Sequence, residues 1–69
     1  MSYSVKKVVV TRDEEGKHKR EITEVARVGF TFNFSWWVRW AGYEFKRDFS
    51  MKGSGYGLDP ETGATFILT

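Results

Sequence analysis

An alternation of apolar and polar residues between positions 26 and 40 is the feature that most restricts how this chain folds. A period of two built from aromatic and β-branched side chains is typical of a strand with one buried face. A helix would spread the same aromatic side chains around its whole circumference. The pattern therefore predicts a long strand, bent at Gly29, because a glycine inside a strand often marks a bulge or bend. The apolar even positions are Ala26, Val28, Phe30, Phe32, Phe34, Trp36, Val38 and Trp40.

The residues that follow predict a hairpin. A two-residue loop at Ala41-Gly42 puts apolar residues of both strands on the same face, whereas a slip of one residue would separate them. Glycine at the second loop position suits the positive φ of a primed turn. The predicted pairs are Trp40 with Tyr43, Val38 with Phe45, Trp36 with Arg47, Phe34 with Phe49 and Phe32 with Met51.

The first third of the chain predicts another hairpin. Asp13-Glu14-Glu15-Gly16 is typical of a type I turn with glycine in the left-handed position, which makes a three-residue loop. The resulting register sets apolar residues and opposite charges across from one another, as cross-strand packing favours. It pairs Val8 with Ile22, Lys6 with Glu24 and Val5 with Val25. A competing interpretation makes residues 17–28 a short helix, and it ranks second because the first half of that segment is polar.

The last residues, 64–69, predict a strand that covers a sheet edge, after a glycine-rich loop at 52–63 with a turn at 59–63. We therefore expect a single domain, residues 1–69, of the all-β class: a five-stranded antiparallel meander curled into a small barrel or half-barrel. The alternative is an α+β fold with a short helix near residues 17–28.

Composition restricts the cellular context and the partners. The chain has no cysteine, and its aromatic residues (six Phe, three Trp and three Tyr) provide the core that a 69-residue domain needs. No apolar run approaches the roughly 20 residues of a membrane span, and the first residues lack the apolar stretch of a secretory signal. We therefore expect a cytoplasmic protein without a membrane partner. The net charge of +2 is spread along the chain, unlike the clustered charge of most nucleic-acid-binding faces.

Nothing in the sequence has the pattern of a catalytic or metal site. The one histidine, His18, lies among Lys17, Lys19 and Arg20 with no partner to orient it as a general base. The glycine-rich run at 53–57 lacks the lysine and serine or threonine of a phosphate-binding loop. We expect no enzyme activity, no metal and no cofactor.

Trp37 is the candidate anchor of a binding surface, because it is out of phase with its neighbours. In a strand it would point away from the core together with Arg39, and the predicted register places Lys46 opposite it. Lys52 and Tyr56 complete the predicted surface, and tryptophan and arginine are enriched at binding hot spots. Alternatively, the 52–63 loop covers Trp37, or Lys46 lies across its ring.

Arg47 falls on the apolar side of the predicted hairpin, so we expect it at the sheet margin with its guanidinium in water. The function that these features favour is a non-enzymatic protein-binding module or inhibitor that occludes a partner surface. Single-stranded nucleic-acid or RNA binding by the same face is the alternative. A scaffold without a partner, natural or designed, is the second alternative, and a homodimer through a sheet edge or aromatic patch is a further one.

Overall fold

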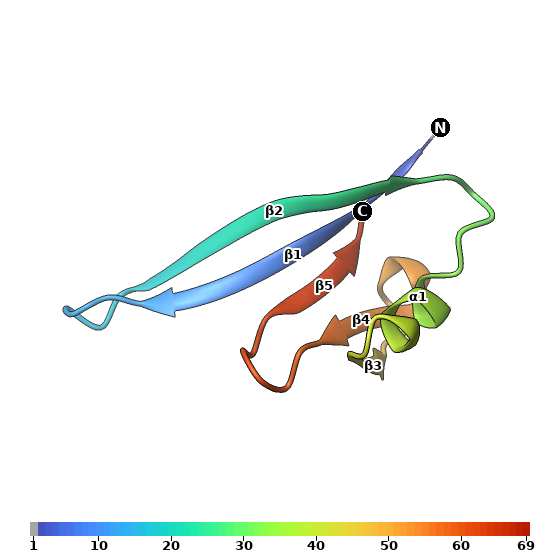
Figure 1. Cartoon of the computed structure of the whole chain (residues 1–69). Coiled ribbons are helices and arrows are strands. Elements are labelled where there is room, and N and C mark those ends of the chain that lie inside the picture. Colours follow the sequence, from blue (N-terminus) through green and yellow to red (C-terminus); the bar gives the residue numbers. More distant parts are fainter. Residues whose placement is uncertain (1) are drawn as a thin grey trace.

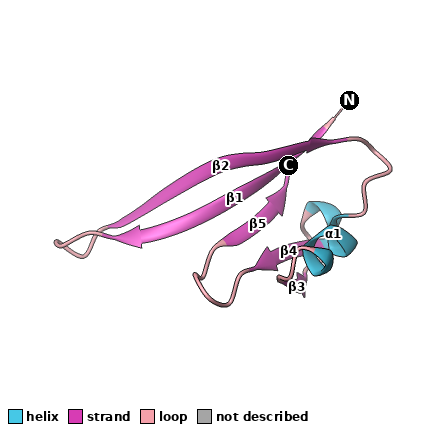
Figure 2. Ribbon diagram, in the orientation of Figure 1, coloured by secondary structure: helices cyan, strands magenta, loops and turns pink. Residues whose placement is uncertain are grey.

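The computed structural model describes residues 2–69 and contains one five-stranded antiparallel sheet with a short helix on one face (Figures 1 and 2). The strands lie in the order β2-β1-β5-β4-β3, and the sheet is open at β2 and β3. The expected antiparallel five-stranded sheet is thus present, but it is not the predicted meander, because the consecutive strands β2 and β3 lie at opposite edges, and closure into a barrel is not confirmed. The elements are β1 (Tyr3–Arg12), β2 (His18–Val28), α1 (Phe34–Trp40), β3 (Glu44–Arg47), a 3₁₀ turn η1 (Lys52–Ser54), β4 (Gly55–Leu58) and β5 (Thr65–Leu68).

The hairpin of β1 and β2 follows the predicted register over most of its length. Val8 pairs with Ile22, and the Gly16 N–H donates to the Asp13 carbonyl at 3.0 Å to close the turn. The register shifts between Val5 and Lys6, so Val5 pairs with Ala26 and the predicted pairing with Val25 is wrong. This shift is a β-bulge, which the alternation of residue types does not reveal. Because residues 18–28 are extended, the position of the alternative helix near 17–28 is wrong, although the alternative α+β class fits in part because a short helix is present elsewhere in the chain.

The predicted strand through residues 34–40 is wrong, because these residues form α1. Asn33 caps its first turn, since its Oδ1 accepts a hydrogen bond from the Trp36 N–H at 3.1 Å. The predicted hairpin loop ends the helix instead: Gly42, with a φ of +91°, donates to the Arg39 carbonyl, and Tyr43 donates to the Val38 carbonyl. These two bonds make a Schellman motif, which needs the left-handed conformation that glycine adopts without steric cost.

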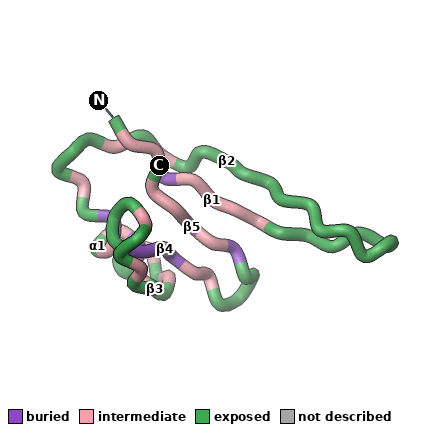
Figure 3. Tube along the Cα trace, turned by 180° about the vertical axis from the view of Figure 1, so that it is seen from behind, coloured by how far each residue is buried: buried purple, intermediate pink, exposed green. Residues whose placement is uncertain are grey.

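The core lies between α1 and the sheet face that it covers. Its buried side chains come from β1, α1 and β5, and Figure 3 shows buried segments in each of them and in β4. In α1 the inward residues recur at the helical spacing of three and four, namely Phe34, Trp37 and Val38. Tyr43 stacks on Phe66 with ring centres 4.4 Å apart. The most buried apolar residues are Val5, Phe34, Val38, Ala64 and Phe66.

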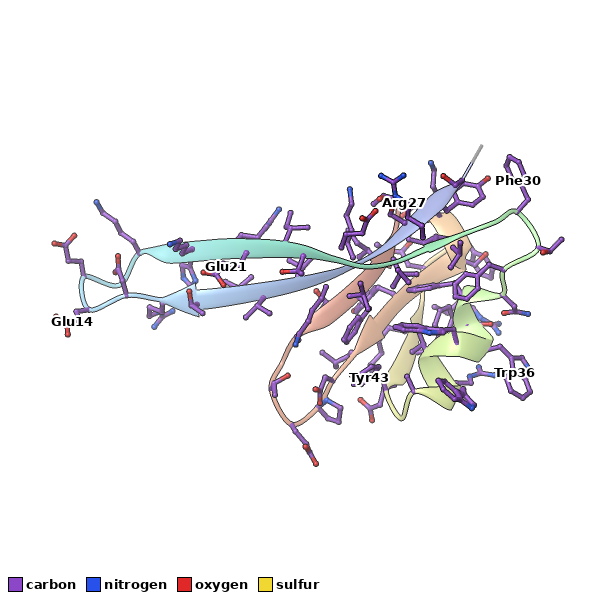
Figure 4. The ribbon with its side chains drawn as sticks, turned by 45° about the horizontal axis from the view of Figure 1, so that its top comes forward. Glu14, Glu21, Arg27, Phe30, Trp36 and Tyr43 are labelled. Carbon is purple, nitrogen blue, oxygen red and sulfur yellow. The ribbon has the colours of Figure 1, made fainter. Side chains whose placement is uncertain are left out.

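The distal half of the first hairpin extends beyond this core. β5 pairs with β1 over residues 5–8, so in the described part of the chain no further strand or helix lies against the outer parts of β1 and β2 (Figures 1 and 3). Glu14 lies at the tip of this arm (Figure 4). The arm accounts for the elongated shape, 43 × 24 × 21 Å.

The predicted loop at 52–63 is more ordered than its composition indicates. It contains η1 and β4, and Gly57 of β4 allows close approach of α1: a Cβ there would lie 3.0 Å from a methyl group of Val38. The predicted turn at 59–63 is present, with the Gly63 N–H donating to the Asp59 carbonyl at 2.8 Å. The predicted last strand is confirmed as β5, which pairs with both β1 and β4.

Candidate functional site

Two tryptophans project from the outer side of α1. Because Phe34, Trp37 and Val38 face the sheet, the helical period directs Trp36 and Trp40 away from it. Their exposed fractions are 68% and 76%, and Figure 4 shows Trp36 pointing away from the sheet. Arg39 follows Trp36 by three residues on the helix, and the side chains of Trp36, Arg39 and Trp40 line a shallow hollow.

A second hollow adjoins the first at Arg39 and extends to the sheet edge at β3. Arg39 Cζ lies 5.9 Å from the centre of the Phe45 ring, and Arg47 Cζ lies 5.8 Å from the centre of the Phe49 ring. Phe49 is 80% exposed. We refer to six of the aromatic and arginine residues that line these two hollows as the Trp-Arg surface. It consists of Trp36, Arg39, Trp40, Phe45, Arg47 and Phe49.

The Trp-Arg surface carries positive charge without a compensating carboxylate. Within residues 2–69 the ion pairs are Lys17–Glu15, Arg27–Glu24 and Lys46–Glu44, so neither Arg39 nor Arg47 is in one. Glu44 and Lys46 alternate with Phe45 along β3 and therefore lie on the other face of the sheet. Each guanidinium group thus lies near an aromatic ring, that of half-buried Phe45 or that of exposed Phe49. This arrangement suits an apolar surface that is bordered by acidic groups.

The loop that presents Phe49 is held by Asp48. One oxygen of the Asp48 carboxylate accepts hydrogen bonds from the Ser50 hydroxyl at 2.6 Å and from the Ser50 N–H at 3.0 Å. The Ser50 hydroxyl, and then its N–H, hold the pKa of Asp48 below its usual value. The Asp48 N–H donates to the Ser54 carbonyl at 2.8 Å, which continues the pairing of β3 and β4 beyond Arg47. Phe49 therefore extends from an ordered turn despite its exposure.

Trp37 does not lie where the alternation places it. Its ring is half-buried and faces Phe32, Phe34 and Phe66, with ring-centre distances of 6.4, 6.3 and 5.9 Å. The prediction that it points away from the core is wrong, because a helix replaces the strand at this position. The alternative prediction, in which Trp37 is covered by another part of the chain, is closer to the structure. The rings that cover it come from α1, β5 and the segment before α1, whereas the prediction named residues 52–63.

The other predicted surface residues do not gather around Trp37. Arg39 belongs to the Trp-Arg surface. Lys46 and Tyr56 are paired across β3 and β4, on the sheet face opposite α1. Lys52 lies elsewhere, with its ammonium 5.3 Å from the centre of the Tyr3 ring.

Arg47 lies at the sheet margin, as the sequence predicts, on the edge strand β3. Its nearest aromatic partner is Phe49 and not the predicted Trp36. The exposed tryptophans were missed because the strand interpretation assigns Trp36 and Trp40 to the core. The sequence does contain signals of a helix between positions 33 and 42. Asparagine at 33 suits a helix N-cap, glycine at 42 suits a helix end, and the apolar residues between them recur at helical spacing.

In residues 2–69 no group of three His, Asp or Glu side chains comes together as a cation site. In the same residues no helix has the length and apolar character required to span a bilayer. No protein-family model, curated protein or solved structure matches this chain.

Proposed function

We propose that this chain is a non-enzymatic protein-binding module or inhibitor that occludes a surface of its partner through the Trp-Arg surface. The observation that carries the proposal is the pair of tryptophans, each more than two thirds exposed, that line one hollow together with Arg39. Tryptophan and arginine are enriched among the residues that dominate binding energy. Exposed aromatic side chains that gather in one place often mark an interaction site.

The fold supports a rigid presentation of these residues. α1 is capped at both ends and packed on the sheet through Phe34, Trp37 and Val38, so its outer side chains start from a fixed backbone. A backbone that is already fixed before binding loses little conformational entropy on binding, which favours affinity. The guanidinium groups of Arg39 and Arg47, which are in no ion pair within residues 2–69, favour a partner that surrounds an apolar patch with carboxylates.

Replacing Trp36 and Trp40 together by alanine is expected to abolish partner capture and leave the fold intact. Loss of a hot-spot side chain costs about 2 kcal/mol or more of binding energy, which is roughly a thirtyfold loss of affinity. The measurement is affinity capture from a nuclease-treated lysate of the source cell, quantified by mass spectrometry for wild type and variant. Thermal unfolding of the variant should match wild type, because both side chains are exposed.

Phe30→Ala is the matched control for this experiment. Phe30 is 63% exposed and lies outside the Trp-Arg surface, where its ring makes an edge contact with Tyr3. We expect Phe30→Ala to retain every protein that wild type captures. Proteins captured equally by wild type and by Trp36→Ala/Trp40→Ala would refute the proposed surface.

Single-stranded nucleic-acid binding is the second candidate, because Arg39 and Arg47 alternate with exposed rings on which bases stack. The affinity for single-stranded DNA can be measured with a fluorescent oligothymidylate of about 20 nucleotides. Nucleic-acid binding predicts an affinity that falls steeply as salt is raised, since phosphate contacts release counterions. The protein-binding proposal predicts no binding to this oligonucleotide even at low salt.

A further inference from the structure

The outer edge of β2 presents unpaired backbone groups over a long stretch. Among residues 2–69, β2 pairs with β1 and with no other strand, and it is an 11-residue edge strand. The Asp13 N–H donates to the Lys17 carbonyl, and on the other side of β1 Ser4 exchanges both hydrogen bonds with Thr69. The backbone N–H and C=O groups of successive residues in a strand point alternately to its two edges. Because the Lys17 carbonyl points toward β1, the backbone groups of Arg20, Ile22 and Glu24 point away from β1.

We propose that two copies of this chain associate through β2, antiparallel about a two-fold axis at Ile22, so that one sheet continues across both copies. In this register Ile22 lies opposite Ile22 of the second copy, and Arg20 lies opposite its Glu24. All three residues have outward backbone groups, as paired edges require. This interface is separate from the Trp-Arg surface and does not rest on the proposed function.

The charges on the edge select this register over its neighbours. An axis at Arg20, Glu21 or Glu24 would place like charges directly opposite each other, which is destabilising. An axis at Thr23 would place Ile22 against a carboxylate. The Ile22 axis forms two opposite-charge pairs and brings together two apolar side chains. Glycine and proline are absent from this stretch, so every residue can donate to the ladder.

The side chains on this edge are free to make the contacts. Ile22 is 56% exposed, as is Val10, which lies on the same face of the hairpin. Within residues 2–69 Arg20 is in no ion pair. Glu24 uses Oε1 both to accept from the Ser4 hydroxyl at 2.6 Å and to contact Arg27 at 3.3 Å, which leaves Oε2 for Arg20 of the second copy. The bulge at Val25 ends the regular edge beyond Glu24.

A charge-reversal experiment tests the register directly by sedimentation equilibrium. Wild type is expected to dimerise reversibly. In a dimer of Arg20→Glu, the new glutamate at position 20 of each copy lies opposite Glu24 of the other copy. In a dimer of Glu24→Arg, the new arginine at position 24 likewise lies opposite Arg20. Each variant should therefore dimerise at least tenfold more weakly than wild type. An equimolar mixture of the two variants restores both opposite-charge pairs and should form a heterodimer. The double variant Arg20→Glu/Glu24→Arg should self-associate like wild type.

Three further variants test the dimer without changing Glu24, in case Glu24→Arg perturbs the hairpin. Ile22→Pro removes an outward N–H without breaking the ladder to β1, and it should abolish the dimer. Lys17→Glu, the same charge reversal at the hairpin tip, and Trp36→Ala/Trp40→Ala should both leave it unchanged. The proposal is overturned by a wild type that stays monomeric at millimolar concentration. It is also overturned if Ile22→Pro and Arg20→Glu associate as strongly as wild type.

Discussion

Replacing Phe66 by alanine is expected to lower the free energy of unfolding by about 3–5 kcal/mol, the usual cost of emptying a buried phenylalanine site. Phe66 is 3% exposed and contacts the rings of both Trp37 and Tyr43, so its removal leaves a cavity between β5 and α1. A chain of 69 residues has an expected stability of only about 3–10 kcal/mol. Urea denaturation followed by tryptophan fluorescence should therefore show a variant that is largely unfolded or close to it.

Phe49→Ala is the matched control, since it deletes the same side chain from a position that is 80% exposed. Its expected effect on stability is within about 0.5 kcal/mol. The strand interpretation of residues 26–40 predicts a different result, because it places Phe49 in the core opposite Phe34. Equal losses of stability for Phe66→Ala and Phe49→Ala would contradict the observed packing of α1 on the sheet.

Gly55→Ala is expected to be the most damaging glycine substitution, with a loss of about 3 kcal/mol or more. Gly55 has a φ of +158° and a ψ of −161°, a region that residues other than glycine essentially do not occupy. An added Cβ would lie 2.2 Å from the Lys46 carbonyl oxygen and 2.8 Å from the Phe45 ring. The backbone of β3 would have to move, because a carbonyl cannot rotate away as a flexible side chain can.

Gly29→Ala is the corresponding control. A Cβ at Gly29 would meet nothing within 4 Å, so this variant should unfold within about 0.5 kcal/mol of wild type. Thermal and urea denaturation measure the free energy of unfolding of both variants. Proton–nitrogen correlation spectra should show that Gly55→Ala shifts the amides of β3 and β4, whereas Gly29→Ala changes only its neighbours. A stable Gly55→Ala with unchanged β3 resonances would contradict the pairing of Arg47 with Gly55.

The first hairpin was predictable because its information is local. Asp13 and Gly16 define the turn, and a turn of known length sets the register of the strands that leave it. The pairs Val8–Ile22 and Lys6–Glu24 follow from that register alone. The bulge at Val25 was not predictable, because an extra residue in one strand leaves no trace in the alternation of residue types.

The segment from Phe34 to Trp40 was assigned incorrectly because its apolar residues satisfy two periods. Phe34, Trp36, Val38 and Trp40 fit a strand, and Phe34, Trp37, Val38 and Ala41 fit one side of a helix. The strand interpretation buries Trp36 and exposes Trp37. In the observed helix, Trp36 is exposed and Trp37 packs against the core. Arg39 is exposed in both interpretations, so the sequence identified it correctly as exposed, as it did Arg47 at the sheet margin.

The sequence by itself determined the antiparallel strands at the two ends of the chain, the turns at 13–16 and 59–63, and an aromatic core. Tertiary structure decided the strand order, the open edges and the helical state of residues 34–40. The physical reason is that β2 and β3 lie at opposite edges of the sheet, so the chain between them crosses one face. There the segment can bury Phe34, Trp37 and Val38 against Phe66 while a helix satisfies its own backbone hydrogen bonds.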